Sequence, residues 1–203
     1  MKSAAEVGEP PVPDAEIRHA LTGVFRREGV LRGRTVVVQE LGLRRSDAII
    51  DIAVVNGSLH GYEIKSDADT LRRLPRQVEV YGQVLDRATL VVGRQHLAAA
   101  RRMVPRWWAM MVVDAGARGP SVLSLRASSE NPDRDARALA ELLWLDEARE
   151  LLGARGALRG FRDRPRPAVW DRLCEVYSLE EIASEVRARL KARASAGSLR
   201  RLS

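Results

Sequence analysis

The fold is decided by residues 49–65, where two apolar runs flank a short polar turn: IIDIAVV (49–55), NGS (56–58) and LHGYEIK (59–65). Apolar runs separated by Asn-Gly are among the strongest short-range signals for a β-hairpin. If residues 56–58 form a three-residue loop, Val55 faces Leu59, and the numbers of every facing pair sum to 114. This count predicts the register of the two strands residue by residue.

The predicted register gathers three charged side chains on one face of the sheet. Asp51 lies directly opposite Glu63, and Lys65 shares their face two residues further on. Two carboxylates held this close repel each other unless a cation lies between them. Their oxygens suit Mg²⁺ or Mn²⁺, with water and a substrate phosphate completing the coordination shell. An amine in the same place could polarise an attacking water or stabilise charge that develops on phosphate.

The residues alone leave two other interpretations of this hairpin open. A two-residue Asn-Gly loop would shift the register by one residue and place Asp51 on the opposite face, which would remove the site. A half-exposed hairpin could also carry Asp51, Glu63 and Lys65 as a solvated ion pair of little energetic value.

The choice of lysine supports the first interpretation. The chain has 34 Lys and Arg residues, and only Lys2, Lys65 and Lys191 are lysines. An ammonium group is a compact charge that can shift its pKa, whereas a guanidinium stays protonated. A lysine placed two residues after a strand carboxylate therefore suggests a site that needs an amine.

Helical spacing over residues 70–85 places Gln77 and Tyr81 on one face of a helix that follows the hairpin. Both side chains can donate hydrogen bonds to phosphate or orient a water molecule. The alternative is that Tyr81 packs in the core and Gln77 is exposed.

The remaining segments predict an α/β layer fold with a mixed sheet and a C-terminal helical extension. Asp14 is the expected N-cap of a first helix, and Ser178 is expected to open a capping box for a last helix to about residue 193. Other strands are predicted over 35–41, 89–92, 109–113 and 121–125, and other helices over 97–103, 133–152 and 168–177. The expected parts are a flexible arm (1–13), an α/β core (14–127), a helical extension (128–194) and a basic tail (195–203).

Composition favours a polyanionic partner, since the net charge is +7 and the pI is about 10.4. The alternative is that the arginines reflect genome composition and general solvation. Cys174 is the only cysteine, which excludes an intramolecular disulfide and a Cys-rich zinc site. Residues 1–13 lack the apolar core of a signal peptide, and no apolar stretch approaches the roughly 18 residues of a membrane span. We therefore expect a cytoplasmic protein with no membrane partner.

Asp51, then Glu63-x-Lys65, then Gln77-x-x-x-Tyr81 resembles the motif order of the RecB-type branch of the PD-(D/E)XK nuclease-like superfamily. Segments 51–57, 59–67, 73–77 and 105–108 are similar to a small group of uncharacterised bacterial proteins within that superfamily. The resemblance covers roughly residues 14–190. It implies a restriction-endonuclease-like core, a mixed sheet flanked by helices that cuts phosphodiesters with Mg²⁺ or Mn²⁺.

By motif match, the resemblance implies that Asp51 and Glu63 are metal ligands together with the carbonyl of Ile64. It also implies that Lys65 is the catalytic ammonium, with Gln77 and Tyr81 as supporting residues.

Two further acids compete for a place in this site. Many superfamily members carry a Glu on the first core helix, and Glu40 is the nearest counterpart here, although the pattern places it on a strand. Asp47 is a rival for the first acid, but it lies too early for the hairpin count. Ile50 stands where the proline of the superfamily name would precede the Asp.

Basic and aromatic residues near this segment have two interpretations each. Arg72, Arg73 and Arg76 surround the start of the Gln77 helix and either contact phosphates or form a solvated helix face. The pair Trp107–Trp108 either stacks on bases or fills the core.

The sequence therefore predicts a metal-dependent nuclease acting on DNA, in which water attacks phosphorus in line with the leaving group. The alternative is a non-catalytic nucleic-acid or protein interaction module that retains the fold. A structural partner in a phage or mobile-element system has no residue in its support. RNA as a substrate, the strandedness of the substrate and the oligomeric state, a homodimer included, stay open at this level.

Overall fold

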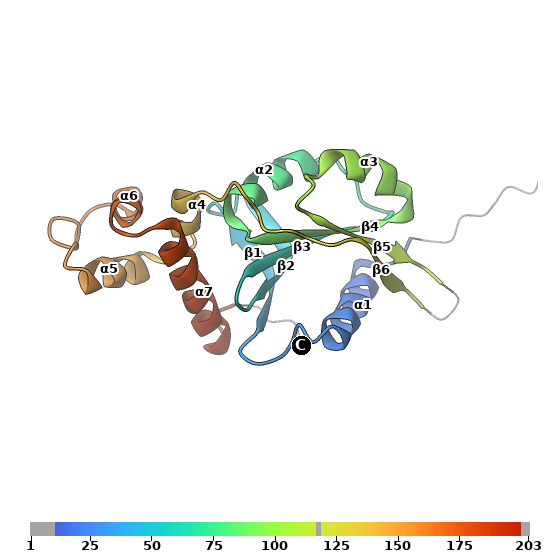
Figure 1. The fold of residues 1–203 in the computed structure, drawn as a ribbon, viewed down its shortest axis with the longest axis horizontal. Helices are drawn as coiled ribbons and strands as arrows, with labels where there is room; N and C mark the ends of the chain where they lie inside the picture. Colours follow the sequence, from blue (N-terminus) through green and yellow to red (C-terminus); the bar gives the residue numbers. More distant parts are fainter. Residues whose placement is uncertain (1–10, 117–118, 200–203) are drawn as a thin grey trace, which may run out of the picture.

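The computed structural model describes residues 11–116 and 119–199 as a six-stranded sheet with helices on both faces (Figure 1). The strands are neighbours in chain order: β1 (Val36–Leu43), β2 (Ala48–Val55), β3 (Leu59–Lys65), β4 (Arg87–Gly93), β5 (Ala109–Asp114) and β6 (Ser121–Arg126). Strands β1–β3 and the pair β5–β6 are antiparallel, whereas β3–β4 and β4–β5 are parallel. The predicted α/β fold with a mixed sheet is confirmed, because hairpins join the antiparallel strands and helical crossovers join the parallel ones.

The hairpin adopts the register predicted from the sequence. The pairs run from Val55↔Leu59 to Ile52↔Tyr62, and each pair sums to 114. The loop has three residues, and its Asn56 side chain accepts a hydrogen bond from the Ser58 N–H at 3.0 Å. The two-residue loop is therefore excluded.

Helix α1 (Asp14–Arg27) covers one face of the sheet with an apolar stripe that includes Ile17, Leu21 and Phe25. The prediction that Asp14 is the N-cap of this helix is wrong, because Pro13 holds that position. The Asp14 carboxylate instead accepts a hydrogen bond from Arg18 Nε at 2.5 Å. An aspartate in the first turn can pair with a basic residue four positions on, and that pairing prevails here.

Helices α2 (Leu74–Val84) and α3 (Leu97–Met103) lie on the other face, with a short 3₁₀ turn, η1 (Arg94–His96), before α3. Helix α2 begins four residues later than its predicted start at residue 70. Pro75 explains this start, since proline fits only the first turn of a helix, where its missing N–H has no partner.

The helical extension contains α4 (Ala136–Ala140), α5 (Leu145–Ala154), α6 (Arg166–Val176) and α7 (Leu179–Ser195). The predicted continuous helix over 133–152 is wrong, because the chain is extended at Trp144 and begins a new helix there. The Trp144 N–H donates to the Glu147 carboxylate at 2.8 Å, and this hydrogen bond caps the N-terminus of α5. The predicted capping box at Ser178 is confirmed, with its N–H 2.8 Å from the Glu181 carboxylate.

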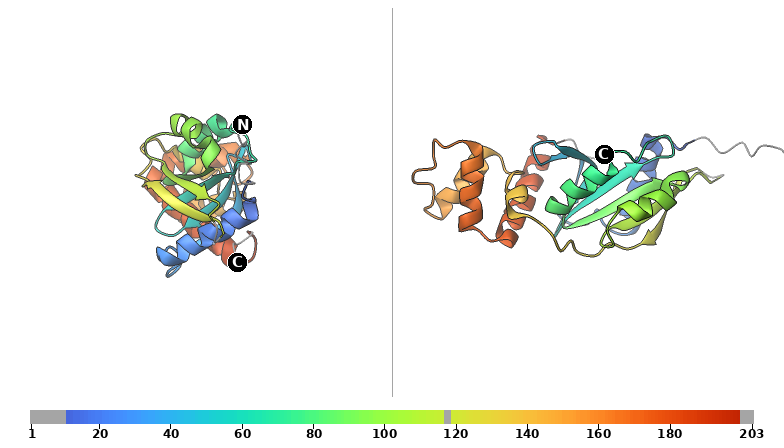
Figure 2. Two further views of the ribbon diagram at one scale, coloured as in Figure 1. Left: turned by 90° about the vertical axis from the view of Figure 1, so that its right-hand side faces the viewer. Right: turned by 90° about the horizontal axis from the view of Figure 1, so that it is seen from above.

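Two apolar clusters fill the spaces on either side of the sheet. The smaller lies under α1, and the larger lies under α2 and α3 and continues into α4–α7. Trp107 and Trp108 are buried in the larger cluster, which confirms that they fill the core. Helices α5 and α6 form the end of the molecule furthest from β6 (Figures 1 and 2).

Residues 1–10 of the predicted arm and residues 200–203 of the predicted basic tail lie outside the described residues. Across residues 11–116 and 119–199, none of the helices has the length and hydrophobicity that crossing a membrane requires.

Candidate functional site

The ends of β1, β2 and β3 and the starts of α1 and α2 enclose a cavity of about 810 Å³. We call it the acidic cavity, because six of its lining side chains are carboxylates and four are cationic: Asp14, Arg18, Glu40, Asp47, Asp51, Glu63, Lys65, Asp69, Arg73 and Arg76. Ile64 and Gln77 also line it. The structure therefore brings most of the predicted site residues to one place, although Glu40 and Gln77 lie 37 residues apart in the sequence. Of the predicted residues, Tyr81 lies behind this lining and Arg72 lies outside it.

Glu63 is the centre of this arrangement and is almost fully buried, with 1% of its surface exposed. Its Oε1 accepts hydrogen bonds from the Lys65 ammonium and from Gln77 Nε2, the latter at 2.5 Å. Its Oε2 lies 2.7 Å from the Tyr81 hydroxyl. Lys65 is itself only 5% exposed. The interpretation of Glu63 and Lys65 as a solvated surface pair is therefore wrong.

Asp51 lies across the hairpin with its carboxylate directed at the end of β3. Its Oδ2 accepts the Ile64 N–H at 2.8 Å, and its Oδ1 lies 3.2 Å from Arg18 Nη2. Arg18 also donates to the Asp51 carbonyl at 3.1 Å. The side chain of Asp51 thus contacts the backbone immediately after Glu63, which fixes the two acids relative to each other.

The two carboxylates influence each other's ionisation. Burial raises the pKa of Glu63 above its ordinary value, and the negative charge of Asp51 raises it further, against the stabilising effect of Lys65. Burial also raises the pKa of Asp51, while the Ile64 N–H and the charges of Arg18 and Lys65 act in the opposite direction. A cation in the cavity would relieve both effects.

Gln77 and Tyr81 hold Glu63 in place from α2. Tyr81 is fully buried, and its hydroxyl is also 2.7 Å from the Ile49 carbonyl. Burial, followed by the charge of Glu63, raises the pKa of the Tyr81 hydroxyl. Gln77 is half-buried rather than exposed, and its Oε1 is buried with no hydrogen-bond partner among the described residues. Tyr81 therefore packs in the core and still contacts the site.

Glu40 faces Asp51 at an interruption of the β1–β2 ladder. The neighbouring residues on both sides remain paired, whereas Glu40 has φ 55°, in the left-handed region that residues other than glycine rarely adopt. The apolar positions of β1 shift by one residue there, from 36 and 38 to 41 and 43, all in the same core cluster. Strained backbone of this kind is concentrated at functional sites. Both acids line the cavity, so Glu40 keeps its place as a candidate metal ligand.

Of the three predicted phosphate-binding arginines, Arg73 and Arg76 line the acidic cavity and Arg72 is exposed outside it. Arg76 pairs with Asp47 and, at 2.7 Å, with Glu79. Asp47 is thus engaged by Arg76 in the β1–β2 turn, while Asp51 contacts β3.

The profile of the family described as bacteriophage P4 protein cII matches residues 12–201. The chain belongs to the bacteriophage P4 cII family. Protein cII of Enterobacteria phage P4 is 32% identical over 78 residues, which cover 38% of this chain and 29% of that protein. The chain therefore matches less than a third of the length of this curated relative.

A solved structure of a protein of unknown function from Silicibacter pomeroyi is similar at 19% identity and a TM-score of 0.45. The similarity covers 76% of this chain and 96% of that one. None of these three descriptions names a nuclease, a metal or the PD-(D/E)XK superfamily. Membership of the cII family consequently assigns no chemistry to the acidic cavity.

The residues of this cII-family chain fit a hard divalent cation in part. No group of three or more His, Cys, Asp or Glu residues in residues 11–116 and 119–199 has the arrangement of a complete metal site. Two mutually repelling carboxylates and a partnerless amide oxygen on Gln77 do face one cavity. Mg²⁺ commonly binds through one or two carboxylates and takes its other ligands from water and substrate phosphate, so Asp51 and Glu63 are the candidate ligands here.

Arg18 is the residue that the sequence analysis missed. Its guanidinium forms an ion pair with Asp51 and a second ion pair with Asp14 on the preceding turn of α1. The i, i+4 spacing of Asp14 and Arg18 is visible in the sequence, but its relation to Asp51 depends on how α1 packs against the sheet.

Proposed function

We propose that this protein hydrolyses phosphodiester bonds of DNA with the help of Mg²⁺ or Mn²⁺. One observation carries the proposal: Asp51, Glu63 and Lys65, the three residues of the resembled motif, line a single cavity, and the Asp51 carboxylate accepts the Ile64 N–H at 2.8 Å between the other two. The antiparallel β1–β3 ribbon followed by parallel β4 and β5 supports a restriction-endonuclease-like fold. We place the activity in the cytoplasm, where DNA is accessible.

In this proposal Asp51 and Glu63, with the Ile64 carbonyl and Glu40, would hold the metal ion. A bound Mg²⁺ or Mn²⁺ supplies Lewis acidity toward phosphate and water.

The protein's own residues position the reaction. The Lys65 ammonium, held beside Glu63, stabilises negative charge as it develops on the phosphate oxygens. Gln77 and Tyr81 fix the Glu63 carboxylate, and the unpaired Gln77 Oε1 can accept a hydrogen bond from the attacking water. Arg73 and Arg76 at the rim of the cavity supply positive charge for the DNA backbone, with Arg72 beside them.

The test is a metal titration of the digestion of linear, circular and single-stranded DNA, with single-stranded RNA alongside. We expect cleavage to require Mg²⁺ or Mn²⁺ and to fall by at least about 100-fold in Asp51→Ala. Asp47→Ala is the matched control, because it removes a carboxylate of the same cavity that pairs with Arg76. Equal loss of activity in the two variants, or full activity of Asp51→Ala, would disprove the assignment.

The competing function is a non-catalytic interaction module, which the internal pairing of Glu63 with Lys65, Gln77 and Tyr81 favours. In that case neither metal stimulates cleavage, and Asp51→Ala binds nucleic acid or a protein partner as tightly as the natural chain.

A further inference from the structure

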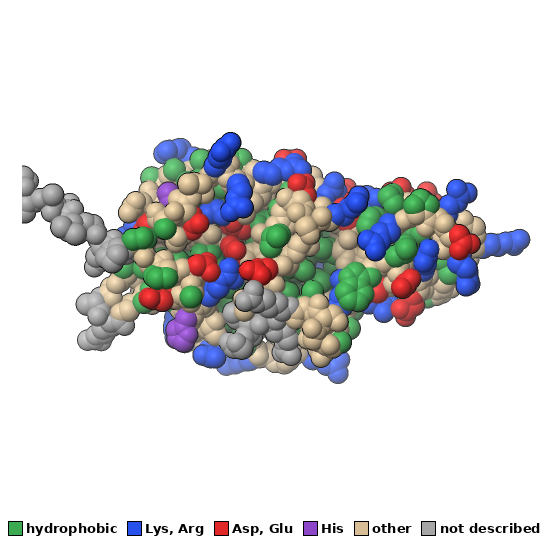
Figure 3. Space-filling model, turned by 180° about the vertical axis from the view of Figure 1, so that it is seen from behind, with side chains coloured by type: hydrophobic (Ala, Val, Ile, Leu, Met, Phe, Trp, Pro, Cys, Tyr) green, Lys and Arg blue, Asp and Glu red, His purple; other side chains and the backbone are tan. Residues whose placement is uncertain are grey.

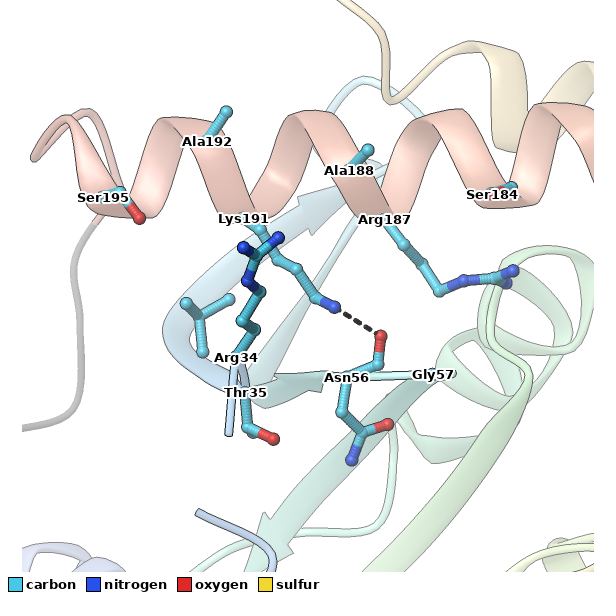
Figure 4. A pocket seen from close by; sticks show the side chains of 11 residues that line it. Arg34, Thr35, Asn56, Gly57, Ser184, Arg187, Ala188, Lys191, Ala192 and Ser195 are labelled. Atoms are coloured by element: carbon cyan, nitrogen blue, oxygen red, sulfur yellow. Dashed lines mark hydrogen bonds between the residues drawn. The ribbon is translucent and has the colours of Figure 1, made fainter. Parts of the chain in front are cut away.

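A second cavity, which we call the basic pocket, lies at the loop end of the same hairpin. It has a volume of about 830 Å³ and lies between Asn56–Gly57, the residues before and at the start of β1, and one face of α7 (Figure 4). No function proposed above uses it.

The charge of the basic pocket is entirely positive. Arg34, Arg187 and Lys191 line it, and none of its eleven lining residues, all in the described part of the chain, is acidic. Ser184 and Ser195 add hydroxyl groups, whereas the Thr35 hydroxyl donates to the Arg32 carbonyl at 2.9 Å. Guanidinium, ammonium and hydroxyl groups around one cavity are the donors that bind phosphate.

Much of this donor capacity is unused. Arg34 is exposed and has no hydrogen bond or ion pair with any other residue in ranges 11–116 and 119–199. Lys191 Nζ donates to the Asn56 carbonyl at 2.6 Å, and an ammonium has two further donors. Figure 4 shows Arg34 reaching from the strand side toward α7, beside Lys191.

Arg187 contributes less, because its guanidinium points away from Arg34 and Lys191 (Figure 4). Its Nη1 lies 3.1 Å from Asp86, a buried carboxylate that Arg134 also contacts at 2.5 Å. Arg34 and Lys191 are therefore the principal cations that a ligand would meet.

The walls of the pocket are held in place before any ligand binds. The Lys191–Asn56 hydrogen bond joins α7 to the hairpin loop, and the loop is closed by Asn56 and Ser58. Gly57 borders open space, since a Cβ added there would meet no atom within 4 Å. A preformed cationic cavity of this size takes a nucleotide-sized group without refolding.

Overall charge does not locate this site. On the face seen in Figure 3, acidic and basic side chains are intermingled rather than gathered into one positive patch. A cavity whose lining has no carboxylate therefore indicates an anion site more specifically than the net charge of the chain does.

We propose that the basic pocket binds a phosphate group, with Arg34 and Lys191 as the principal ligands. The phosphate belongs either to a nucleic-acid backbone or to a free phosphate compound. Only the choice of nucleic acid as a source rests on the proposed function. The binding itself does not depend on it.

The experiment measures binding in EDTA, so that no metal-dependent cleavage contributes. One arm titrates a short DNA duplex by fluorescence anisotropy over a range of salt concentrations, and the other titrates inorganic pyrophosphate by calorimetry. The variants are Arg34→Glu and Lys191→Gln, the second of which keeps a donor for the Asn56 carbonyl. Arg102→Glu is the matched control, because it makes the same charge change at an exposed residue of α3 outside both cavities.

We expect Arg34→Glu to weaken binding by about 10-fold in at least one arm, and Arg102→Glu by less than about twofold. In the duplex arm, Lys191→Gln should also reduce the slope of log K against log salt by about 1. A loss in the duplex arm identifies a nucleic-acid phosphate, and a loss confined to pyrophosphate identifies a free phosphate compound.

The proposal is overturned if the natural chain binds neither probe, or if Arg34→Glu and Arg102→Glu weaken binding equally. Failure of metal-dependent cleavage in the Asp51→Ala comparison leaves this result unchanged, so the two proposals fail separately.

Discussion

The two cavities lie at opposite ends of one β-hairpin and use charge in opposite ways. The acidic cavity combines six carboxylates with four cations, and its central groups are buried and paired with one another. The basic pocket has three cations and no carboxylate in its lining, and Arg34 is left without a partner in the described chain. The comparison shows that buried, paired charges hold a site together, whereas open, unpaired charges are available to a ligand.

The largest expected effect is in the acidic cavity. Lys65→Met should lower the free energy of unfolding by about 3–5 kcal/mol near neutral pH, because it leaves the buried Glu63 carboxylate without its cation. Urea denaturation measures this change. The loss exceeds that of an exposed ion pair because Glu63 and Lys65 are both buried.

The double variant Glu63→Gln, Lys65→Met is the control for that prediction, since it removes both charges. It should recover much of the lost stability. If the single and double variants are equally unstable, the loss comes from packing rather than from an unpaired charge.

The next effect concerns Asp86, which links Arg187 and Arg134 beside the basic pocket. Asp86→Asn should cost about 1–3 kcal/mol of stability, because two arginines lose a charged acceptor. It should also tighten phosphate binding, since Arg187 is released toward the pocket. Unchanged pyrophosphate affinity in a folded Asp86→Asn protein would show that Arg187 takes no part in binding.

The pH dependence of stability provides a third comparison. The pKa of Glu63 is raised above 4.5 in the folded protein, so the folded state holds this proton more tightly than the unfolded state. Its contribution is therefore most favourable below pH 4.5 and declines as pH rises through the folded-state pKa. Glu63→Gln should remove this decline, as followed by denaturation at a series of pH values.

The quantity to measure is the difference in the free energy of unfolding between the natural chain and Glu63→Gln at each pH, because His60 changes stability in the opposite direction. Burial lowers the pKa of His60 to about 4, so its contribution to stability increases with pH between that value and 6.5. This contribution is common to both proteins and cancels. Parallel stability curves would contradict the raised pKa of Glu63.

The smallest effect is expected for Arg34→Met in the basic pocket. It should change the free energy of unfolding by no more than about 0.5 kcal/mol, since Arg34 is exposed and unpaired among the described residues. A larger loss in urea denaturation would show that Arg34 is part of the folded framework and not an available ligand.

Much of the site was accessible from local sequence because the hairpin is a local structure. The Asn-Gly turn and the alternation around it determined which residues of β2 and β3 face each other, and the register is confirmed from Val55↔Leu59 to Ile52↔Tyr62. Gln77 follows from the helical period of the next segment. The interruption at Glu40 also left a signal, the shift of apolar positions between residues 38 and 41, which the strand prediction overlooked.

Other features depend on contacts between distant segments. Arg18 reaches Asp51 across 33 residues, and Lys191 reaches Asn56 across 135. The break at Trp144 depends on a cap, which competes with a sequence that has good helix formers throughout. No local pattern contains these distances, so no local pattern predicts them.

The sequence by itself determined the order of strands and helices in the α/β core and the face on which Asp51, Glu63 and Lys65 lie, because alternation and turn chemistry act between near neighbours. The tertiary structure decided that Glu63 and Lys65 are buried, that Arg18 engages Asp51, and that α7 closes a second, basic pocket over the hairpin loop. Burial and cavities arise where separate elements pack together, and their positions follow from the whole chain rather than from any one segment.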